Sequence, residues 1–232
     1  MVKRITIILA LCCALTATLF SQSFDPDFQP FVTRPGDVEK LALMPDGRFV
    51  VAGSFSLANR VERTNIARFL ADGSLDETFQ PSLNFAISAL AVQPDGKVLI
   101  GGRYLDEGAP EGITILRLNT NGSLDNSFQA GFAPDGSFAD IAVENNGTIL
   151  VGGSFTEFAG QAVQGVVRLS SGGALQNVIP LNTSGVVFVS SLLVQSSGRF
   201  AVGGTVNEQG YLSYHEYSGA PVAGFNFSIT LP

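Results

Sequence analysis

The chain repeats one pattern of apolar and polar positions four times. In its clearest copy, an apolar run that ends at Val92 is followed by the turn Gln93-Pro94-Asp95-Gly96-Lys97, the apolar run Val98-Leu99-Ile100 and the pair Gly101-Gly102. The other copies lie at Leu43–Gly53, Val143–Gly153 and Val194–Gly204. A period of about fifty residues is typical of structural units that stack on one another to bury their apolar faces.

Each repeat is predicted to form three short strands and a tail. The predicted first strands are 40–43, 89–92, 140–143 and 191–194, the second strands are 49–52, 98–101, 149–151 and 200–202, and the third strands are 66–69, 115–118, 166–169 and 212–215. Nearly continuous apolar residues in the first two strands indicate that both faces of each sheet are covered, and Val50, Leu99, Leu150 and Val202 should be buried. The sequence therefore predicts an all-β array of four repeats, with cores near 38–79, 85–128, 137–179 and 188–225.

Turn residues support this division. Pro-Asp-Gly joins the first two strands in repeats one and two, and Asn-Asn-Gly and Ser-Ser-Gly replace it in repeats three and four. All three sequences suit a tight turn whose last residue is left-handed. Glycines also follow each second strand, at positions 53, 102, 153 and 204, where a missing side chain lets another backbone approach closely.

The tails place opposite charges at a constant spacing. A turn at Asp72 sets Arg68 across from Asp76, and the next repeat sets Arg117 across from Asp125. Such a cross-strand pair contributes up to about 1 kcal/mol. By the same count Arg168 faces Gln176 in the third repeat and Tyr214 faces Val222 in the fourth. The spacing predicts structural pairs that fix the third hairpin.

These residues resemble a known family. Gln93 to Lys97, Gly101-Gly102, Arg117-Leu118 and Asn121 to Asp125 with Phe128 are similar to the delta-60 repeat. The resemblance covers nearly everything after residue 23 and is weakest in the fourth repeat, which keeps mainly its glycines and Phe225. It implies an exported bacterial protein built of β-propeller blades, and it brings no catalytic residue or ligand. A closed four-blade ring and an incomplete or open propeller both fit, and a linear β-solenoid is the competing architecture.

The first 23 residues have the pattern of an export signal. Lys3 and Arg4 precede a charge-free apolar run of 16 residues, Ile5–Phe20, and Ser21-Gln22-Ser23 follows. A bilayer-spanning helix needs roughly 20 apolar residues, so a signal peptide is favoured over an anchor. The residues before Cys12 and Cys13 fit a lipidation site poorly, because a small residue is needed there. The predicted location is outside the bacterial cytoplasm, as a secreted, periplasmic or cell-surface protein without a membrane span.

Charge and residue counts exclude several functions. The chain has 13 basic and 20 acidic residues, which argues against nucleic acid as a partner. Both cysteines lie in the predicted signal peptide, and His215 is the single histidine, so thiol chemistry and His/Cys metal sites are excluded. No catalytic residue and no cofactor is predicted. Calcium is the remaining alternative, because the turns at Asp72-Gly73 and Asn119–Asp125 offer oxygen ligands.

The loops between second and third strands differ most among repeats, and such loops on a β scaffold usually carry binding residues. The candidate binding residues are Arg60, Arg63, Tyr104, Asp106, Glu107, Glu111, Phe155 and Glu157. The leading function is an exported, non-catalytic scaffold that binds a polysaccharide or another exported protein. The alternative is a carbohydrate-active hydrolase or lyase that uses loop carboxylates such as Asp106 and Glu107.

The ends of the array raise the question of closure. Phe24–Pro30 aligns without gaps to Leu75–Pro81, so one tail precedes the first core, and Gly219–Phe225 forms another after the fourth. If the ring closes, the N-terminal tail should occupy the outer edge of the last blade, because Pro221 weakens the C-terminal tail. If it does not close, an open edge is left as a surface for self-association.

Overall fold

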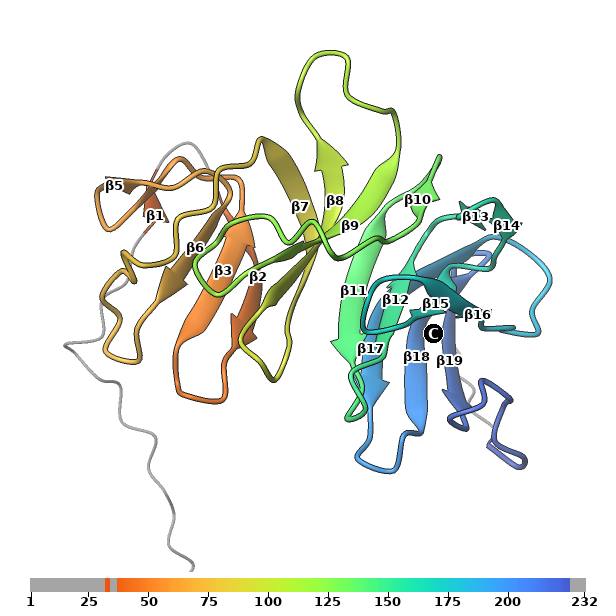
Figure 1. Ribbon diagram of the computed structural model, residues 1–232. Coiled ribbons are helices and arrows are strands. Elements are labelled where there is room, and N and C mark those ends of the chain that lie inside the picture. Colours follow the sequence, from red (N-terminus) through yellow and green to blue (C-terminus); the bar gives the residue numbers. More distant parts are fainter. Residues whose placement is uncertain (1–31, 34–36, 226–232) are drawn as a thin grey trace, which may run out of the picture.

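Four antiparallel sheets, which we call blades 1 to 4, follow one another in sequence order (Figure 1). The computed structural model describes residues 32–33 and 37–225; the predicted signal peptide and the tail Phe24–Pro30 lie outside these residues. Within the described residues, no helix is long and apolar enough to cross a membrane. The all-β fold predicted from the sequence is confirmed.

The blades contain three or four strands each. Blade 1 consists of β2 (Val38–Leu43), β3 (Phe49–Gly53) and β6 (Ile66–Phe69); blade 2 of β7 (Phe85–Val92), β8 (Val98–Tyr104), β9 (Ile113–Leu118) and β10 (Phe132–Ala133); blade 3 of β11 (Phe138–Val143), β12 (Ile149–Gly153), β15 (Val166–Leu169) and β16 (Leu175–Val178); and blade 4 of β17 (Val187–Val194), β18 (Phe200–Val206) and β19 (Gln209–His215).

The turns and glycines behave as their chemistry requires. Gly96 has a φ of 81°, and the Asp95 carboxylate accepts the backbone N–H of Lys97, so the turn closes on itself. A Cβ at Gly102 would lie 1.9 Å from the carbonyl oxygen of Ala86. A Cβ at the equivalent glycines 53, 153 and 204 would lie 2.0 Å from the carbonyl oxygen of Asp37, Ser137 or Phe188, beside the place where the pairing of the first strand changes register. The predicted close approach is confirmed, and a β-bulge is its cause.

The core lies between successive blades. One apolar cluster joins Val50 of blade 1 to Ile100 of blade 2, the next joins Leu99 to Val151 of blade 3, and the third joins Leu150 to Val202 of blade 4. Val50, Leu99, Leu150 and Val202 are fully buried, as predicted. Each sheet is covered on the face toward its neighbour, which explains the continuous apolar runs.

Two of the predicted irregular loops are in fact short hairpins. β4 (Leu57–Ala58) pairs with β5 (Val61–Glu62), and β13 (Glu157–Phe158) pairs with β14 (Gln161–Ala162). β1 (Val32–Thr33) pairs with β4. In blade 4 the expected loop is replaced by a tight turn between β18 and β19. Only blade 2 keeps a long irregular connection, residues 105–112, which rises above the sheet in Figure 1.

A buried arginine joins each blade to the next, and we call this arrangement a clasp. Arg68 Nε lies 2.8 Å from Asp76 Oδ2, and its Nη1 donates to the carbonyl oxygen of Thr120 in blade 2 at 2.7 Å. The guanidinium also lies over the ring of Phe79, 4.6 Å from its centroid. The predicted Arg68–Asp76 pair is confirmed. Arg68 also contacts the next blade, which a pair within one hairpin would not do.

The second clasp repeats these contacts. Arg117 Nε lies 2.9 Å from Asp125 Oδ2, its Nη1 donates to the carbonyl oxygen of Ser171 in blade 3 at 2.6 Å, and Phe128 lies beneath it. Lys97 adds a further ion pair to Asp125 at 2.8 Å.

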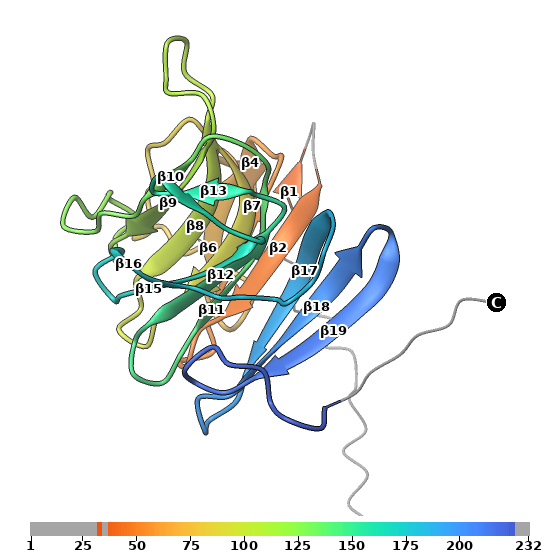
Figure 2. The ribbon, with the colours of Figure 1, turned by 90° about the vertical axis from the view of Figure 1, so that its right-hand side faces the viewer.

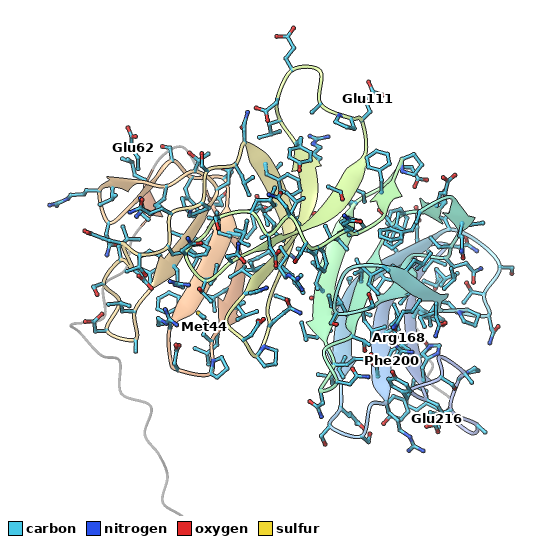
Figure 3. The ribbon with its side chains drawn as sticks, in the orientation of Figure 1. Met44, Glu62, Glu111, Arg168, Phe200 and Glu216 are labelled. Atoms are coloured by element: carbon cyan, nitrogen blue, oxygen red, sulfur yellow. The ribbon has the colours of Figure 1, made fainter. Side chains whose placement is uncertain are left out.

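The third clasp differs from the prediction. Arg168 pairs in the ladder with Asn177, because a bulge between Arg168 and Leu169 shifts the register, so the expected position opposite Gln176 is wrong. Its carboxylate partner is Glu144, at 2.9 Å, and its guanidinium donates to the carbonyl oxygen of Tyr217. Figure 3 shows Arg168 beside Phe200 of blade 4, over whose ring it lies. In blade 4, Val222 donates its N–H to the Tyr214 carbonyl, as the predicted pairing requires.

The array is open. Figure 1 shows blade 1 on the left and blades 3 and 4 overlapping on the right, and Figure 2 shows the strands of blade 4 at an edge of the molecule. No strand pairing joins blade 4 to blade 1 within the described residues. The outer position of blade 4 is taken by its own tail, through the bridge between His215 and Pro221. The contact expected of a closed ring would involve Phe24–Phe28, which lie outside the described residues.

Candidate functional site

A groove crosses blades 1 to 3 where the first strands begin. It encloses about 380 Å³ and is lined by Glu39, Gly53, Ser54, Asn65, Ala86, Ile87, Ser88, Gly102, Arg103, Leu105, Ile113, Gly136 and Ser137. Gly53 and Gly102 contribute no side chain to the groove, because each lies too close to a backbone carbonyl oxygen for a Cβ atom to fit. The volume is within the range of small-ligand sites in proteins.

A second depression of about 590 Å³ adjoins the groove and shares Arg103, Leu105, Ile113 and Gly136 with it. The irregular connection of blade 2 supplies most of its wall, and Asp135 comes from the segment before β11. Figure 3 shows Glu111 on this raised connection. The two depressions together form one candidate site, which we call the upper groove.

The polar side chains of the upper groove are of two kinds. Asn65 donates to the carbonyl oxygen of Phe85, and Ser137 shares a hydrogen bond with Ser154, so both hold neighbouring segments in place. Arg103 and Glu39 are exposed, and neither forms an ion pair with another described residue. The groove therefore offers one cation and one anion to a ligand.

The carboxylates of the second depression are partly engaged. Asp106 accepts a hydrogen bond from Asn84 Nδ2 at 2.9 Å. Asp135 accepts hydrogen bonds from the hydroxyl and the backbone N–H of Thr156, and these bonds lower the pKa of its carboxyl group. Asp135 is therefore ionised at neutral pH and serves to orient the hairpin that follows β12.

The upper groove contains three of the eight residues predicted from the sequence. Tyr104, Asp106 and Glu111 line it, and Tyr104 packs edge-on against Phe85 with ring centroids 5.1 Å apart. Glu107 belongs to the same connection without lining either depression. Glu39 and Asn65 were missed: Glu39 lies in the first strand β2 and not in a loop, and Asn65 is the last residue of its loop, directly before β6.

The other predicted residues lie elsewhere. Arg60 and Arg63 belong to the blade 1 hairpin, where Arg63 donates to the carbonyl oxygen of Glu62. Glu157 is exposed on β13. Phe155 is a correction: it is buried in the core against Phe138, with ring centroids 5.2 Å apart, and presents no surface to a ligand.

The turns considered for calcium use their oxygen atoms internally. Asp72 Oδ1 accepts both the N–H and the hydroxyl of Ser74, and Asn121 Oδ1 does the same with Ser123. Across residues 32–33 and 37–225, no group of three or more His, Cys, Asp or Glu residues is arranged to hold a metal ion.

Comparison with known proteins supports the fold. Residues 45–79, 93–128 and 144–175 match the family described as "Domain of unknown function (DUF5122) beta-propeller". Each matched segment runs from the turn after a first strand toward the tail of the same repeat. The repeats of this chain are therefore of β-propeller type. A comparison with curated proteins found no match.

Two solved structures illustrate the likeness. A protein of unknown function from Bacteroides caccae has a TM-score of 0.43 and 14% identity, over 82% of this chain and 81% of the other. A GH74 xyloglucanase from Xanthomonas campestris has a TM-score of 0.52 and 15% identity, over 83% of this chain and 31% of the enzyme. The chain thus spans less than a third of that enzyme, and at this identity the likeness concerns the fold alone.

Proposed function

We propose that this chain, whose repeats are of β-propeller type, is an exported, non-catalytic binding module that holds a polar ligand in the upper groove. The proposal rests on three side chains of the upper groove. Arg103 and Glu39 are exposed and form no ion pair with a described residue, and the partly exposed aromatic ring of Tyr104 lies in the adjoining depression. A saccharide suits these groups, because its hydroxyls both donate to a carboxylate and accept from a guanidinium, and its ring packs on an aromatic face.

Several features agree with a binding role. The glycines and serines in the groove leave room for a chain-like ligand to cross blades 1 to 3. The spacing of Gln93 to Lys97, Gly101-Gly102 and Asn121 to Asp125 further supports membership of the delta-60 repeat proteins. The Met1–Ser23 pattern supports export, where a surface polysaccharide is available as a ligand.

The test is a binding screen of the purified protein against polysaccharides and oligosaccharides, followed by calorimetry on each ligand found. Arg103→Gln should weaken binding by about tenfold or more, because it removes a charged donor from the groove. Arg199→Gln is the matched control: Arg199 is an exposed arginine on blade 4 that pairs with Glu216 at 2.8 Å, and its loss should leave the affinity unchanged. Equal affinities of the two variants would refute the site.

A carbohydrate-active enzyme is the second candidate, since Asp106, Glu111 and Asp135 line one depression. Glycoside hydrolysis needs two carboxyl groups, one of them a proton donor with a raised pKa. Hydrogen bonds hold the pKa of Asp135 low, and the carboxyl group whose pKa is raised by burial, Asp140, lines neither depression. Release of reducing ends from a bound polysaccharide, abolished by Glu111→Gln, would replace the binding proposal with this one.

A further inference from the structure

On the face of blade 1 that points away from blade 2, the first strand β2 lacks the cover that the first strand has in every later blade, although Val51 of β3 and Phe69 of β6 on the same face are buried. Leu41 is 65% exposed, whereas Leu90, Ile141 and Leu192, at the same place in β7, β11 and β17, are 8%, 4% and 8% exposed. Val38 is likewise 45% exposed, and its counterparts Ile87, Phe138 and Val189 are at most 5% exposed. We call this surface, with the exposed Leu43, the backward face of blade 1.

The opposite face of blade 4 is uncovered too. Leu193 is 66% exposed and stands where blade 2 has the buried Ala91. Phe188, which is 50% exposed, lies farther along β17 beside Thr205 of β18. We call this surface the forward face of blade 4. Exposed apolar surface of this kind on a folded protein marks an interaction site.

The repeats themselves indicate what covers these two surfaces. In each internal interface, the forward face of one blade packs on the backward face of the next, as Leu99 of blade 2 packs with Val151 of blade 3. Among the described residues, apolar first-strand side chains stay exposed on one face of each kind, the forward face of blade 4 and the backward face of blade 1. The missing contact therefore has the same chemistry as the three contacts that are present.

We propose that a second copy of this chain supplies that contact. Blade 4 of each copy packs on blade 1 of its partner, and the two contacts close an assembly of eight blades about a two-fold axis. A head-to-tail contact closes only when its rotation returns to the starting copy, so the proposal requires each four-blade array to span half of a ring. Eight blades lie within the four to eight usual for β-propellers. Within one copy, blades 1 and 4 form separate sheets that no strand pairing joins among the described residues.

The first test measures the mass of the purified protein by light scattering and sedimentation over a range of concentrations. The mass of wild type should rise with concentration to that of two chains. Leu41→Asp and Leu193→Asp should each weaken the association by about tenfold or more, because each places an uncompensated charge in an apolar contact. Leu124→Asp is the control, since Leu124 is 36% exposed in the tail of blade 2 and belongs to neither face. Phe188→Ser gives an independent variant if Leu193→Asp alters the circular dichroism spectrum.

The second test distinguishes a head-to-tail contact from a symmetric one. A mixture of Leu41→Lys and Leu193→Asp proteins forms one wild-type contact and one contact between opposite charges, so it should recover dimers that neither protein forms alone. A wild-type monomer at all concentrations would overturn the proposal, and so would open-ended filaments. Disruption by only one of the two substitutions would also overturn it, because that result means that like faces pair.

Discussion

Replacing Asp76 by alanine should lower the free energy of unfolding by about 2 to 5 kcal/mol. Burial alone would raise the pKa of Asp76, but hydrogen bonds from Thr78 and Arg68 outweigh it and lower the pKa from 3.8 to about 2. Since one unit of pKa corresponds to about 1.4 kcal/mol, the ionised carboxylate contributes roughly 2 kcal/mol at neutral pH. The upper value applies because Arg68, which is also buried, loses its anionic partner.

The pH dependence of this effect has a fixed sign. A carboxyl group whose pKa is lowered by folding stabilises the protein above its ordinary pKa, and the contribution disappears as the pH falls from about 4 to about 2. Chemical denaturation of wild type and of Asp76→Ala at several pH values should therefore show a difference that is constant above about pH 5 and shrinks at lower pH.

An exposed ion pair in the same chain provides the control. Arg199 and Glu216 are 2.8 Å apart, and nearly half of each side chain is exposed, so Glu216→Ala should cost less than about 1 kcal/mol. If Asp76→Ala costs no more than Glu216→Ala, or if its effect is the same at pH 3 as at pH 7, the account of the clasp as a buried, charged contact is wrong.

Two other substitutions test the core. Leu99→Ala, at a fully buried position between blades 2 and 3, should cost about 2 to 5 kcal/mol, whereas Leu70→Ala in an exposed turn should cost under about 1; equal unfolding midpoints would contradict the packing. His215 is buried, stacks on Phe200 and has a lowered pKa, chiefly because of burial, so wild type should lose stability as the pH falls below about 6.5. His215→Leu, which introduces the residue of repeats two and three, should remove that loss between pH 7 and 5 in thermal unfolding; an unchanged pH dependence would refute the assignment.

Local chemistry explains why much of the fold could be predicted. The turn at Asp95-Gly96 and the close approach at Gly102 depend on residues next to each other in sequence or across one strand pair. The Arg68–Asp76 pair follows from counting outward from one turn. The strength of this pair was not predicted, because the count gives a cross-strand pair worth up to about 1 kcal/mol, whereas the structure buries both groups and joins Arg68 to blade 2.

The parts that could not be predicted depend on long-range geometry. A bulge in blade 3 moves Arg168 away from Gln176, and its partner, Glu144, comes from 24 residues earlier in the chain. Long-range geometry also explains why only part of the candidate site was predicted. Tyr104 and Glu111 lie on a connection that stays irregular, but Phe155 belongs to a segment that folds back as a hairpin and buries its ring.

The clasps also bear on how the array ends. Arg68, Arg117 and Arg168 each donate to a carbonyl oxygen of the following blade, so every internal interface combines apolar packing with a charged contact. Blade 4 has Tyr214 at this position, whose hydroxyl donates to Gln195 within its own blade. The forward face of blade 4 therefore presents apolar contacts without the arginine. A contact between two copies through this face would be weaker than the internal interfaces, so the eight-blade assembly should dissociate on dilution while each four-blade chain stays folded.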